Sequence, residues 1–221
     1  MTALSSEVSK VLKAGADWIH VDVVDNHFAK VLTFGPPIVA SLRRKHRSAF
    51  LDVHLAVERP SEYVDVLEKA GASQVLFHPE SFSATTADEE MEKLALQIRS
   101  TGMRAGVALR PETPVSAIAF LLRPKQLLQC VDILAVQPGF GGQKFDAGVL
   151  RKVKELRSMC PGLDIQVDGG VNVDTASACV AAGANILTSG SFIFTDSDGE
   201  SYAGAVQELR RTLSTKWKLA T

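Results

Sequence analysis

The 221-residue sequence predicts an α/β protein of the (β/α)₈ TIM-barrel type, built as a single domain over residues 1–221. Short runs rich in Val, Ile and Leu alternate along the chain with amphipathic stretches, which is typical of a parallel sheet with crossover helices. A weak internal repeat supports this, because Gly15, Gly71 and Gly183 each separate a helix-like stretch from a strand-like one and lie 56 and 112 residues apart. This one-to-two ratio fits barrel units of about 28 residues, and a doubly wound open sheet would also accommodate it.

Seven strands are expected, each as a short apolar run between turn residues. They are Trp18–Val24, Phe50–Leu55, Gln74–His78, Arg104–Leu109, Val131–Val136, Asp164–Val167 and Asn185–Thr188. Helical patterns fall between them, for example at Glu62–Ala70, Glu89–Ser100, Ala147–Ser158 and Asp174–Ala182. The first patterned stretch, Ser5–Ala14, already has helical spacing, with its apolar residues on one face. A closed eight-stranded barrel needs one further strand before this helix, so we expect the first strand of the barrel to be missing from the sequence.

Composition and charge narrow the classes of function. Hydrophobic residues make up 46% and charged residues 22% of the chain, as in ordinary globular proteins, and the formal net charge is −1. This balance favours neither nucleic acid nor an anionic membrane as a partner, and no run of about 18 apolar residues predicts a membrane span. The first residues resemble neither a signal peptide nor a transit peptide, so we expect a cytoplasmic protein. The three cysteines lack a CxxC spacing and are expected to stay reduced.

Polar side chains interrupt the predicted strands at three places. His20 and Asp22 are two residues apart and so point to the same side of one strand, His54 is near the end of the next, and Asp168 ends a later one. A buried parallel strand is apolar on both faces, so these groups are costly there unless they are paired or bind a metal. His20 alone would more simply be a buried structural residue. Together, two imidazoles and two carboxylates at strand ends favour a site for zinc, iron, manganese or cobalt.

Glycine-rich turns follow the last three predicted strands. They contain Gly139, Phe140, Gly141 and Gly142 after one strand, Gly169 and Gly170 after the next, and Gly190 and Ser191 after the last. Glycine leaves backbone N–H groups free to approach an anion, and these loops are the usual phosphate site of barrel enzymes. Each turn taken alone is equally well explained as a tight turn, so the indication of a phosphate site comes from all three.

The segments that carry these residues resemble ribulose-phosphate 3-epimerases, from about Leu4 to about Phe194. The matching strings, in the order of that family, are Ala14–Asp22, Asp25–Phe28, Leu32–Pro36, Leu51–Leu55, Pro138–Phe145 and Val167–Val171. The resemblance implies interconversion of D-ribulose 5-phosphate and D-xylulose 5-phosphate in the pentose phosphate pathway, by proton abstraction and return at C3. It also implies a homodimer or a larger ring.

The resemblance also implies roles for individual residues. The family's metal ligands, for one divalent transition metal, fall on His20, Asp22, His54 and Asp168, and its acid/base pair falls on Asp22 and Asp168. The substrate-binding residues that it implies are His54, Gly139, Phe140, Gly141, Gly142, Asp168, Gly169, Gly170, Gly190 and Ser191. The substrate would be a small sugar phosphate, with the metal stabilising negative charge on the enediolate oxygens.

Other polar residues and departures from the family leave alternatives open. Asp52 shares a face with His54 and is expected to orient it, whereas His78 either lines the pocket or is a buried core histidine. The family's first strand, which carries a substrate-contacting serine, has no counterpart, and pocket methionines are replaced by smaller residues at Val24, Ala56 and Leu134. The alternatives are an epimerase for a ketohexose phosphate and a truncated or degenerate paralogue without catalysis.

Overall fold

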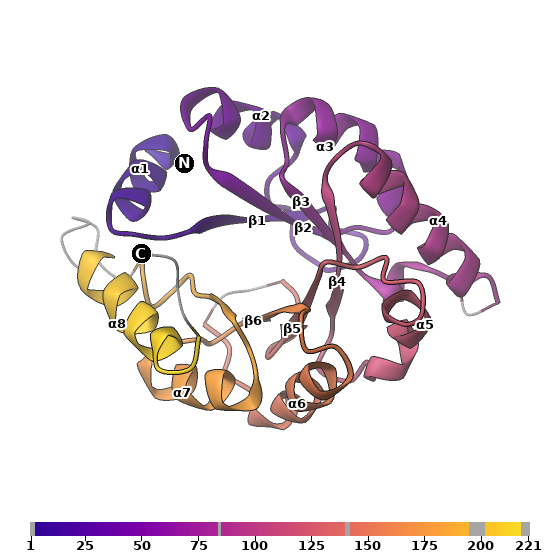
Figure 1. Ribbon diagram of the computed structural model, residues 1–221. Helices are drawn as coiled ribbons and strands as arrows, with labels where there is room; N and C mark the ends of the chain where they lie inside the picture. Colours follow the sequence, from indigo (N-terminus) through magenta and orange to yellow (C-terminus); the bar gives the residue numbers. More distant parts are fainter. Residues whose placement is uncertain (1–2, 84, 140–141, 195–201, 218–221) are drawn as a thin grey trace.

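The computed structural model describes residues 3–83, 85–139, 142–194 and 202–217, in which seven parallel strands form one curved sheet inside a ring of helices (Figure 1). The strands are β1 (Trp18–Val24), β2 (Phe50–Ala56), β3 (Gln74–Phe77), β4 (Arg104–Leu109), β5 (Cys130–Leu134), β6 (Asp164–Asp168) and β7 (Ile186–Thr188). Each strand pairs with the next one in the sequence, which is the order of a (β/α) barrel. The predicted strands are confirmed to within two residues at each end.

The helices alternate with the strands and cover the outside of the sheet (Figure 1). Among the described residues they are α1 (Leu4–Lys13), α2 (Pro36–Lys45), α3 (Val64–Ala70), α4 (Ala87–Ser100), α5 (Ala119–Leu122), α6 (Leu150–Met159), α7 (Val173–Ala182) and α8 (Tyr202–Ser214). Short 3₁₀ segments occupy Pro60–Tyr63, Pro79–Ser81, Val115–Ile118 and Ala147–Val149. Two predicted helices therefore begin later than expected, because their first residues form a 3₁₀ turn before α3 and α6. None of the helices in the described part of the chain is long and apolar enough to cross a bilayer.

The sheet does not close on itself. β1 pairs with β2 and β7 pairs with β6, but β1 and β7 are not neighbours in the hydrogen-bonded order. The helices α1 and α8 flank this gap on the outside and contact each other, with Tyr202 Oη donating to Glu7 Oε2 at 2.6 Å (Figure 1). The described residues thus form seven of the eight strands that a closed barrel requires, as the sequence predicts.

The internal repeat corresponds to two matching arginine contacts on the outside of the barrel. Arg43 Nε on α2 donates to the Gly71 carbonyl at 2.8 Å, and Arg157 Nε on α6 donates to the Gly183 carbonyl at 2.9 Å. Both glycines have positive φ angles, of 84° and 124°, and a Cβ on Gly71 would lie 2.6 Å from Arg43 Cγ. The third glycine of the repeat, Gly15 (φ 103°), lies beside the gap between β1 and β7. The repeat therefore reflects a recurring helix-to-strand joint.

The main apolar core lies between the sheet and the helices. Outward-facing strand residues such as Val53 belong to one buried cluster with helix residues such as Leu94. A small second cluster of Leu76, Ala108 and Cys130 lies apart from it. Leu76 is opposite His54 and Ala108 is opposite Asp132 in the strand register, so this cluster lies on the inward face of the sheet.

Candidate active site

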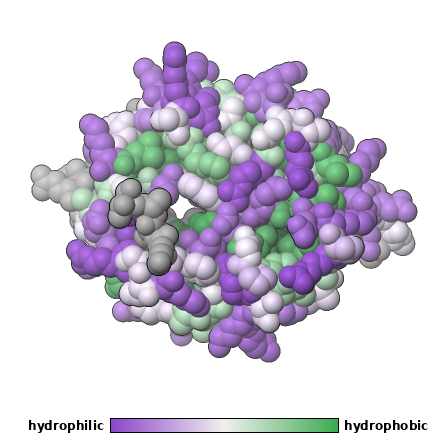
Figure 2. Space-filling view, viewed as in Figure 1, coloured by the Kyte–Doolittle hydropathy of each residue, from purple (hydrophilic) through white to green (hydrophobic). Residues whose placement is uncertain are grey.

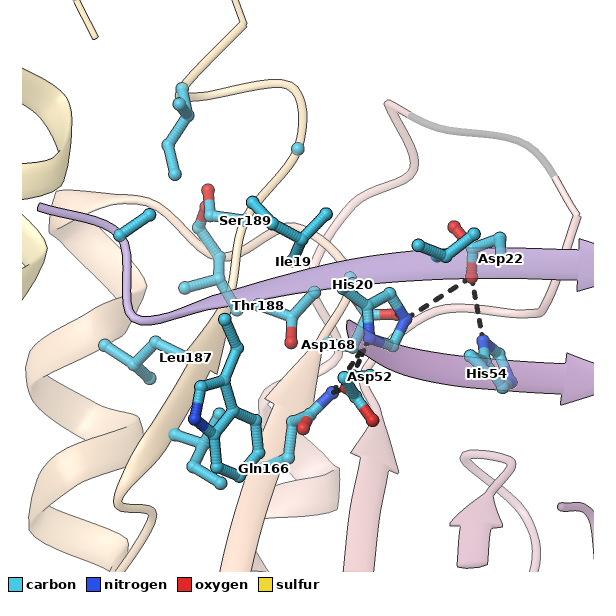
Figure 3. Close-up of a pocket in the computed structure, with 18 of the residues that line it drawn as sticks. Ile19, His20, Asp22, Asp52, His54, Gln166, Asp168, Leu187, Thr188 and Ser189 are labelled. Atoms are coloured by element: carbon cyan, nitrogen blue, oxygen red, sulfur yellow. Dashed lines mark hydrogen bonds and ion pairs between the residues drawn. The ribbon is translucent and has the colours of Figure 1, made fainter. Parts of the chain in front are cut away.

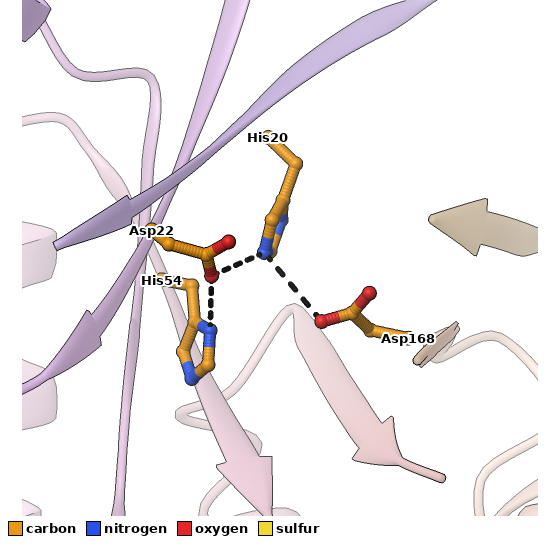
Figure 4. A group of neighbouring side chains, drawn as sticks. All are labelled: His20, Asp22, His54 and Asp168. Atoms are coloured by element: carbon orange, nitrogen blue, oxygen red, sulfur yellow. Dashed lines mark hydrogen bonds and ion pairs between the residues drawn. The ribbon is translucent and has the colours of Figure 1, made fainter. Parts of the chain in front are cut away.

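Strands β1, β2 and β6 bring two histidine and two aspartate side chains together at the carboxyl end of the barrel. His20 and Asp22 are two residues apart on β1, so the pleat turns both into the barrel. Parallel pairing sets Asp22 opposite His54 on β2, and Asp168 is the last residue of β6. Figure 4 shows the four side chains pointing toward one another. The structure therefore groups the four residues that the sequence singled out, while their role as ligands stays a prediction.

The spacing of the four side chains suits a single metal ion. One ligand atom from each lies within 4.8 Å of the other three. His20 Nε2 is 3.4 Å from Asp22 Oδ1 and 3.9 Å from Asp168 Oδ2, and His54 Nδ1 is 2.9 Å from Asp22 Oδ1. Imidazole and carboxylate ligands lie about 2.0–2.2 Å from zinc, so two ligands of one ion are separated by about 4.4 Å at most. A slight closure of the group is enough for all four to share a cation.

The ring of His20 shows independently that a cation fits. Its Nδ1 contacts Asp52 Oδ2 at 2.7 Å, whereas the buried Nε2, which faces two carboxylates, has no hydrogen-bond partner among the described residues. A buried polar atom without a partner is destabilising, and a metal ion in front of it would satisfy it. The set of two imidazoles and two carboxylates is the ligand chemistry of a divalent transition metal.

The neighbouring charges shift the pKa values of His20, Asp22 and Asp168 in different directions. Burial alone would lower the pKa of His20, but the carboxylates of Asp22 and Asp52 outweigh burial and raise this pKa well above its ordinary value. Loss of contact with water would raise the pKa of Asp22, but its close contacts with the rings of His20 and His54 hold this pKa far below its ordinary value. Burial, together with the charge of Asp22, raises the pKa of Asp168. Asp22 is therefore ionised, and Asp168 is the carboxyl group that more readily holds a proton.

Asp52 supports His20 and not His54, so the expectation from sequence is wrong on this point. The Asp52 carboxylate also accepts a hydrogen bond from Gln74 Nε2 at 2.8 Å. It accepts a further one from Gln166 Nε2 at 3.1 Å (Figure 3). The reason is the strand register, which places Asp52 directly opposite His20. His54 is two residues further along the same strand, a separation of about 6.6 Å, so the two side chains do not meet.

His54 has a different support, formed by residues that follow β3. His78 Nε2 lies 2.8 Å from His54 Nε2, and His78 Nδ1 lies 3.0 Å from Glu80 Oε2. His78 is completely buried, which lowers its pKa to about 4 in spite of the nearby Glu80. Burial alone would raise the pKa of Glu80, but its hydrogen bond with His78 lowers it to about 2. Sequence reasoning missed Glu80 altogether, since its only sequence signal is a position two residues after His78.

A cavity of about 710 Å³ connects the four side chains with the loops that follow β5, β6 and β7. Of the predicted substrate-binding residues, the cavity is lined by His54, Gly139, Gly142, Asp168, Gly169, Gly170, Gly190 and Ser191. Phe140 and Gly141 lie outside the described residues. The cavity continues along the gap between β1 and β7, where apolar side chains of α1 and α8 line it. Figure 2 shows a hollow in this part of the surface, beside hydrophobic residues.

Some glycines of these loops are required by the fold itself. Gly169 has a φ of 95°, and a Cβ there would lie 2.4 Å from Val136 Cγ2. Gly190, in contrast, has open space around it. The loop after β6 is thus explained by packing, and a role of all three loops in binding phosphate stays a prediction.

Comparison with known proteins identifies the family. Residues 1–194 match the Ribulose-phosphate 3 epimerase family. The chain is 44% identical to the cytoplasmic isoform of ribulose-phosphate 3-epimerase from Oryza sativa subsp. japonica, over 86% of this chain and 81% of that protein. It is 40% identical to the Bacillus subtilis ribulose-phosphate 3-epimerase, over 94% of this chain and 92% of that protein.

Solved structures show the same fold at much lower sequence identity. The 3-hexulose-6-phosphate synthase of Salmonella typhimurium superposes with a TM-score of 0.71 over 97% of this chain and 93% of that one, at 14% identity. This likeness shows the barrel fold alone. The family match and the relatives at about 40% identity establish more, and by them this chain belongs to the ribulose-phosphate 3-epimerase family and is an isomerase.

Proposed function

We propose that this epimerase interconverts D-ribulose 5-phosphate and D-xylulose 5-phosphate with one divalent transition metal held by His20, Asp22, His54 and Asp168. One observation carries the proposal: the four side chains converge at the carboxyl end of the barrel, where they line the large cavity. Active sites of (β/α) barrels lie at that end. The names of the relatives at about 40% identity support the choice of substrate.

Inversion at C3 needs one group that takes a proton and another that returns one to the opposite face of the carbon. Asp22 on β1 and Asp168 on β6 come from separate parts of the barrel wall and face each other across the site (Figure 4). In one direction, ionised Asp22 accepts the C3 proton, the electron pair moves toward the ketone oxygen as an enediolate forms, and protonated Asp168 donates its proton to the other face. In the reverse direction the two residues exchange roles.

A divalent cation bound by the four ligands would supply positive charge that stabilises the enediolate oxygens. Asp52 contributes by keeping the Nδ1 proton of His20 engaged, so that Nε2 stays directed into the site. We place the substrate phosphate at the loops after β5, β6 and β7, since backbone N–H groups of such loops are the usual phosphate ligands in barrels.

Deuterium exchange tests this reaction directly. Metal-stripped protein is reloaded with Zn²⁺, Mn²⁺, Co²⁺ or Fe²⁺ and incubated with D-ribulose 5-phosphate in D₂O, and NMR follows deuterium at C3. We expect metal-dependent deuterium incorporation together with formation of D-xylulose 5-phosphate. A folded, metal-loaded protein that forms no D-xylulose 5-phosphate and exchanges no C3 proton would contradict the proposal and support a non-catalytic paralogue.

An epimerase for a six-carbon ketose phosphate is the second candidate. Val24 and Leu134 line the cavity at positions where the resemblance implies larger methionines, so a longer substrate has room there. The ratio of kcat/KM for D-ribulose 5-phosphate to that for a ketohexose 6-phosphate separates the two. We expect the ratio to exceed 1, and a ratio below 1 would favour the six-carbon substrate.

We also propose that the protein is a homo-oligomer. The resemblance to the family supports this proposal. Light scattering after size-exclusion chromatography gives the mass in solution, and a monomeric mass would contradict the proposal.

A further inference from the structure

A line of hydrogen-bonded side chains runs from the site to the end of β4. It starts at His54, continues through His78 to Glu80, and ends where Glu80 Oε1 accepts hydrogen bonds from Thr113 Oγ1 and from the Arg110 backbone N–H (3.3 Å). The two histidine side chains are almost wholly inaccessible to solvent. No residue of this line beyond His54 lines the cavity. These residues can therefore act on the site only through His54.

Counting protons along this line fixes where each ring carries its hydrogen. The Arg110 backbone N–H can only donate, so Glu80 accepts at Oε1, and as a carboxylate it also accepts at Oε2. His78 Nδ1 must therefore carry a proton. A neutral His78 then has a bare lone pair on Nε2, so the single proton in the 2.8 Å contact belongs to His54 Nε2.

The consequence is that His54 Nδ1, which faces the site, carries no proton. The tautomer of His54 with its proton on Nε2 presents a lone pair on Nδ1, and this atom lies 2.9 Å from Asp22 Oδ1. Two acceptors at that distance repel unless a cation lies between them or beside both. The opposite tautomer, with a proton on Nδ1, would donate to Asp22 and so occupy the nitrogen that the metal requires.

We infer that Glu80, acting through His78, is a positioning residue that holds His54 in the tautomer with a free Nδ1 for the metal. The inference rests on the proposed metal site, since it assigns a task to residues behind one of its ligands. Packing holds the intermediate ring in place, because the Phe28 ring lies 4.5 Å from the His78 ring and the Arg110 guanidinium lies 4.2 Å from the Phe28 ring. Partners of metal-bound histidines of this kind change metal affinity by about 10–100-fold.

The substitution Glu80→Gln should exchange the donor and acceptor in each hydrogen bond from residue 80 to His54, with little change in the shape of the side chain. The Arg110 N–H still needs an acceptor, so the amide oxygen of Gln takes the Oε1 position and its NH₂ group faces His78. His78 then carries its proton on Nε2 and donates to His54, whose own proton moves to Nδ1. The matched control is Glu92→Gln on α4, whose carboxylate pairs with Lys125 at the surface. Thr113→Val is a second control, because it removes a hydrogen bond to Glu80 but leaves the carboxylate in place.

The measurement is the dissociation constant for Zn²⁺, by competition with a chromophoric chelator, in the full chain and in the three variants. We expect Glu80→Gln to weaken Zn²⁺ binding by about 10–100-fold. We expect Glu92→Gln and Thr113→Val to stay within about threefold of the wild type, since neither alters the tautomer. A folded Glu80→Gln variant that binds Zn²⁺ as tightly as the wild type overturns the inference, whereas a wild type that binds no metal overturns the proposed function.

Nitrogen NMR of the histidine rings tests the inference even if Glu80→Gln fails to fold. In the Zn²⁺-loaded wild type, we expect the proton of His54 on Nε2 and the proton of His78 on Nδ1, from the ¹⁵N shifts and their couplings to the ring carbon protons. A His54 ring protonated on Nδ1 in that sample overturns the inference.

Discussion

The two ends of strand β6 carry the same side chain in opposite surroundings. At the amino end, Asp164 pairs with Arg104, and Asn185 Nδ2 donates to its other carboxylate oxygen at 2.7 Å. The Arg104 guanidinium also lies 5.3 and 5.7 Å from the rings of Trp18 and Phe50, which stack on each other. The charge of Asp164 is therefore neutralised by Arg104, and the two aromatic rings pack against the guanidinium of that arginine.

Asp168, at the carboxyl end, has different surroundings. Among the described residues no Lys or Arg forms an ion pair with it, and its charged neighbours include a second carboxylate, Asp22. Below it on β5, Asp132 is completely buried, and neither of its carboxylate oxygens has a hydrogen-bond partner in the described chain. Carboxylates are thus paired with cationic side chains at the amino end of β6, whereas at the carboxyl end they outnumber the cationic side chains beside them, as a cation-binding site requires.

The largest expected effect is on epimerase activity, which should fall in the Asp168 variant and not in the Asp164 variant. Asp168→Asn removes one of the two groups that transfer protons at C3, so we expect epimerisation to fall by about two to four orders of magnitude. Asp164→Asn, four residues earlier on the same strand, should leave kcat within about threefold. Asp164 lies at the amino end of the strand, away from the end at which barrel active sites form. Steady-state assays of both variants, with circular dichroism as a check of folding, make the comparison. Equal losses in the two variants would remove the functional distinction between the ends.

Low pH should destabilise the metal-free protein because His78 and Glu80, at the carboxyl end of the barrel, have lowered pKa values in the folded state. The pKa of His78 is lowered to about 4 from an ordinary value of 6.5, so the unfolded chain takes up this proton first. Its contribution to stability is fully present above about pH 6.5 and is lost as the pH falls to about 4, by up to about 3 kcal/mol. Glu80, with its pKa lowered to about 2, adds a further loss as the pH falls below about 4.5.

Urea unfolding of metal-free protein over this pH range measures the effect. The His78→Asn variant lacks the imidazole, so its free energy of unfolding should fall less between about pH 6.5 and pH 4 than that of the wild type. The same fall in both proteins would show that another group at the carboxyl end carries the acid sensitivity.

A smaller effect is expected on stability at the amino end. Asp164→Asn removes the charge that pairs with Arg104 and weakens a partly buried ion pair, which should lower the free energy of unfolding by about 1–2 kcal/mol. Urea unfolding at neutral pH measures this loss. An unchanged free energy of unfolding would mean that the rings and Asn185 hold this end without the ion pair.

The smallest expected effect has the opposite sign. The pKa of Asp168 is raised in the folded state, so its stabilising contribution is present below about pH 3.8 and is lost as the pH rises through the folded-state pKa. Asp168→Asn should therefore stabilise the metal-free protein, and the gain should grow as the pH rises through the folded-state pKa of Asp168. A loss of stability in the metal-free variant would contradict the idea that carboxylates are in excess at this end.

Much of the fold and the site could be predicted because each rests on patterns within a single strand. Alternating apolar runs placed all seven strands, and the spacing of His20 and Asp22 put both on the inward face. Partnership across strands could not be predicted in this way. Which histidine Asp52 supports depends on the register of β1 against β2, and the link from His54 to Glu80 depends on the turn after β3.

The metal content of the purified chain after dialysis against metal-free buffer tests most directly whether the carboxyl end of the barrel binds a cation. Mass spectrometry of the wild type and of Asp164→Asn should find about one transition-metal ion per chain in each, because the four ligands are intact in both. A double variant, His20→Ala with His54→Ala, should retain none. A folded wild type that binds no transition metal, even when it is supplied in excess, would contradict the account of the carboxyl end as a cation site.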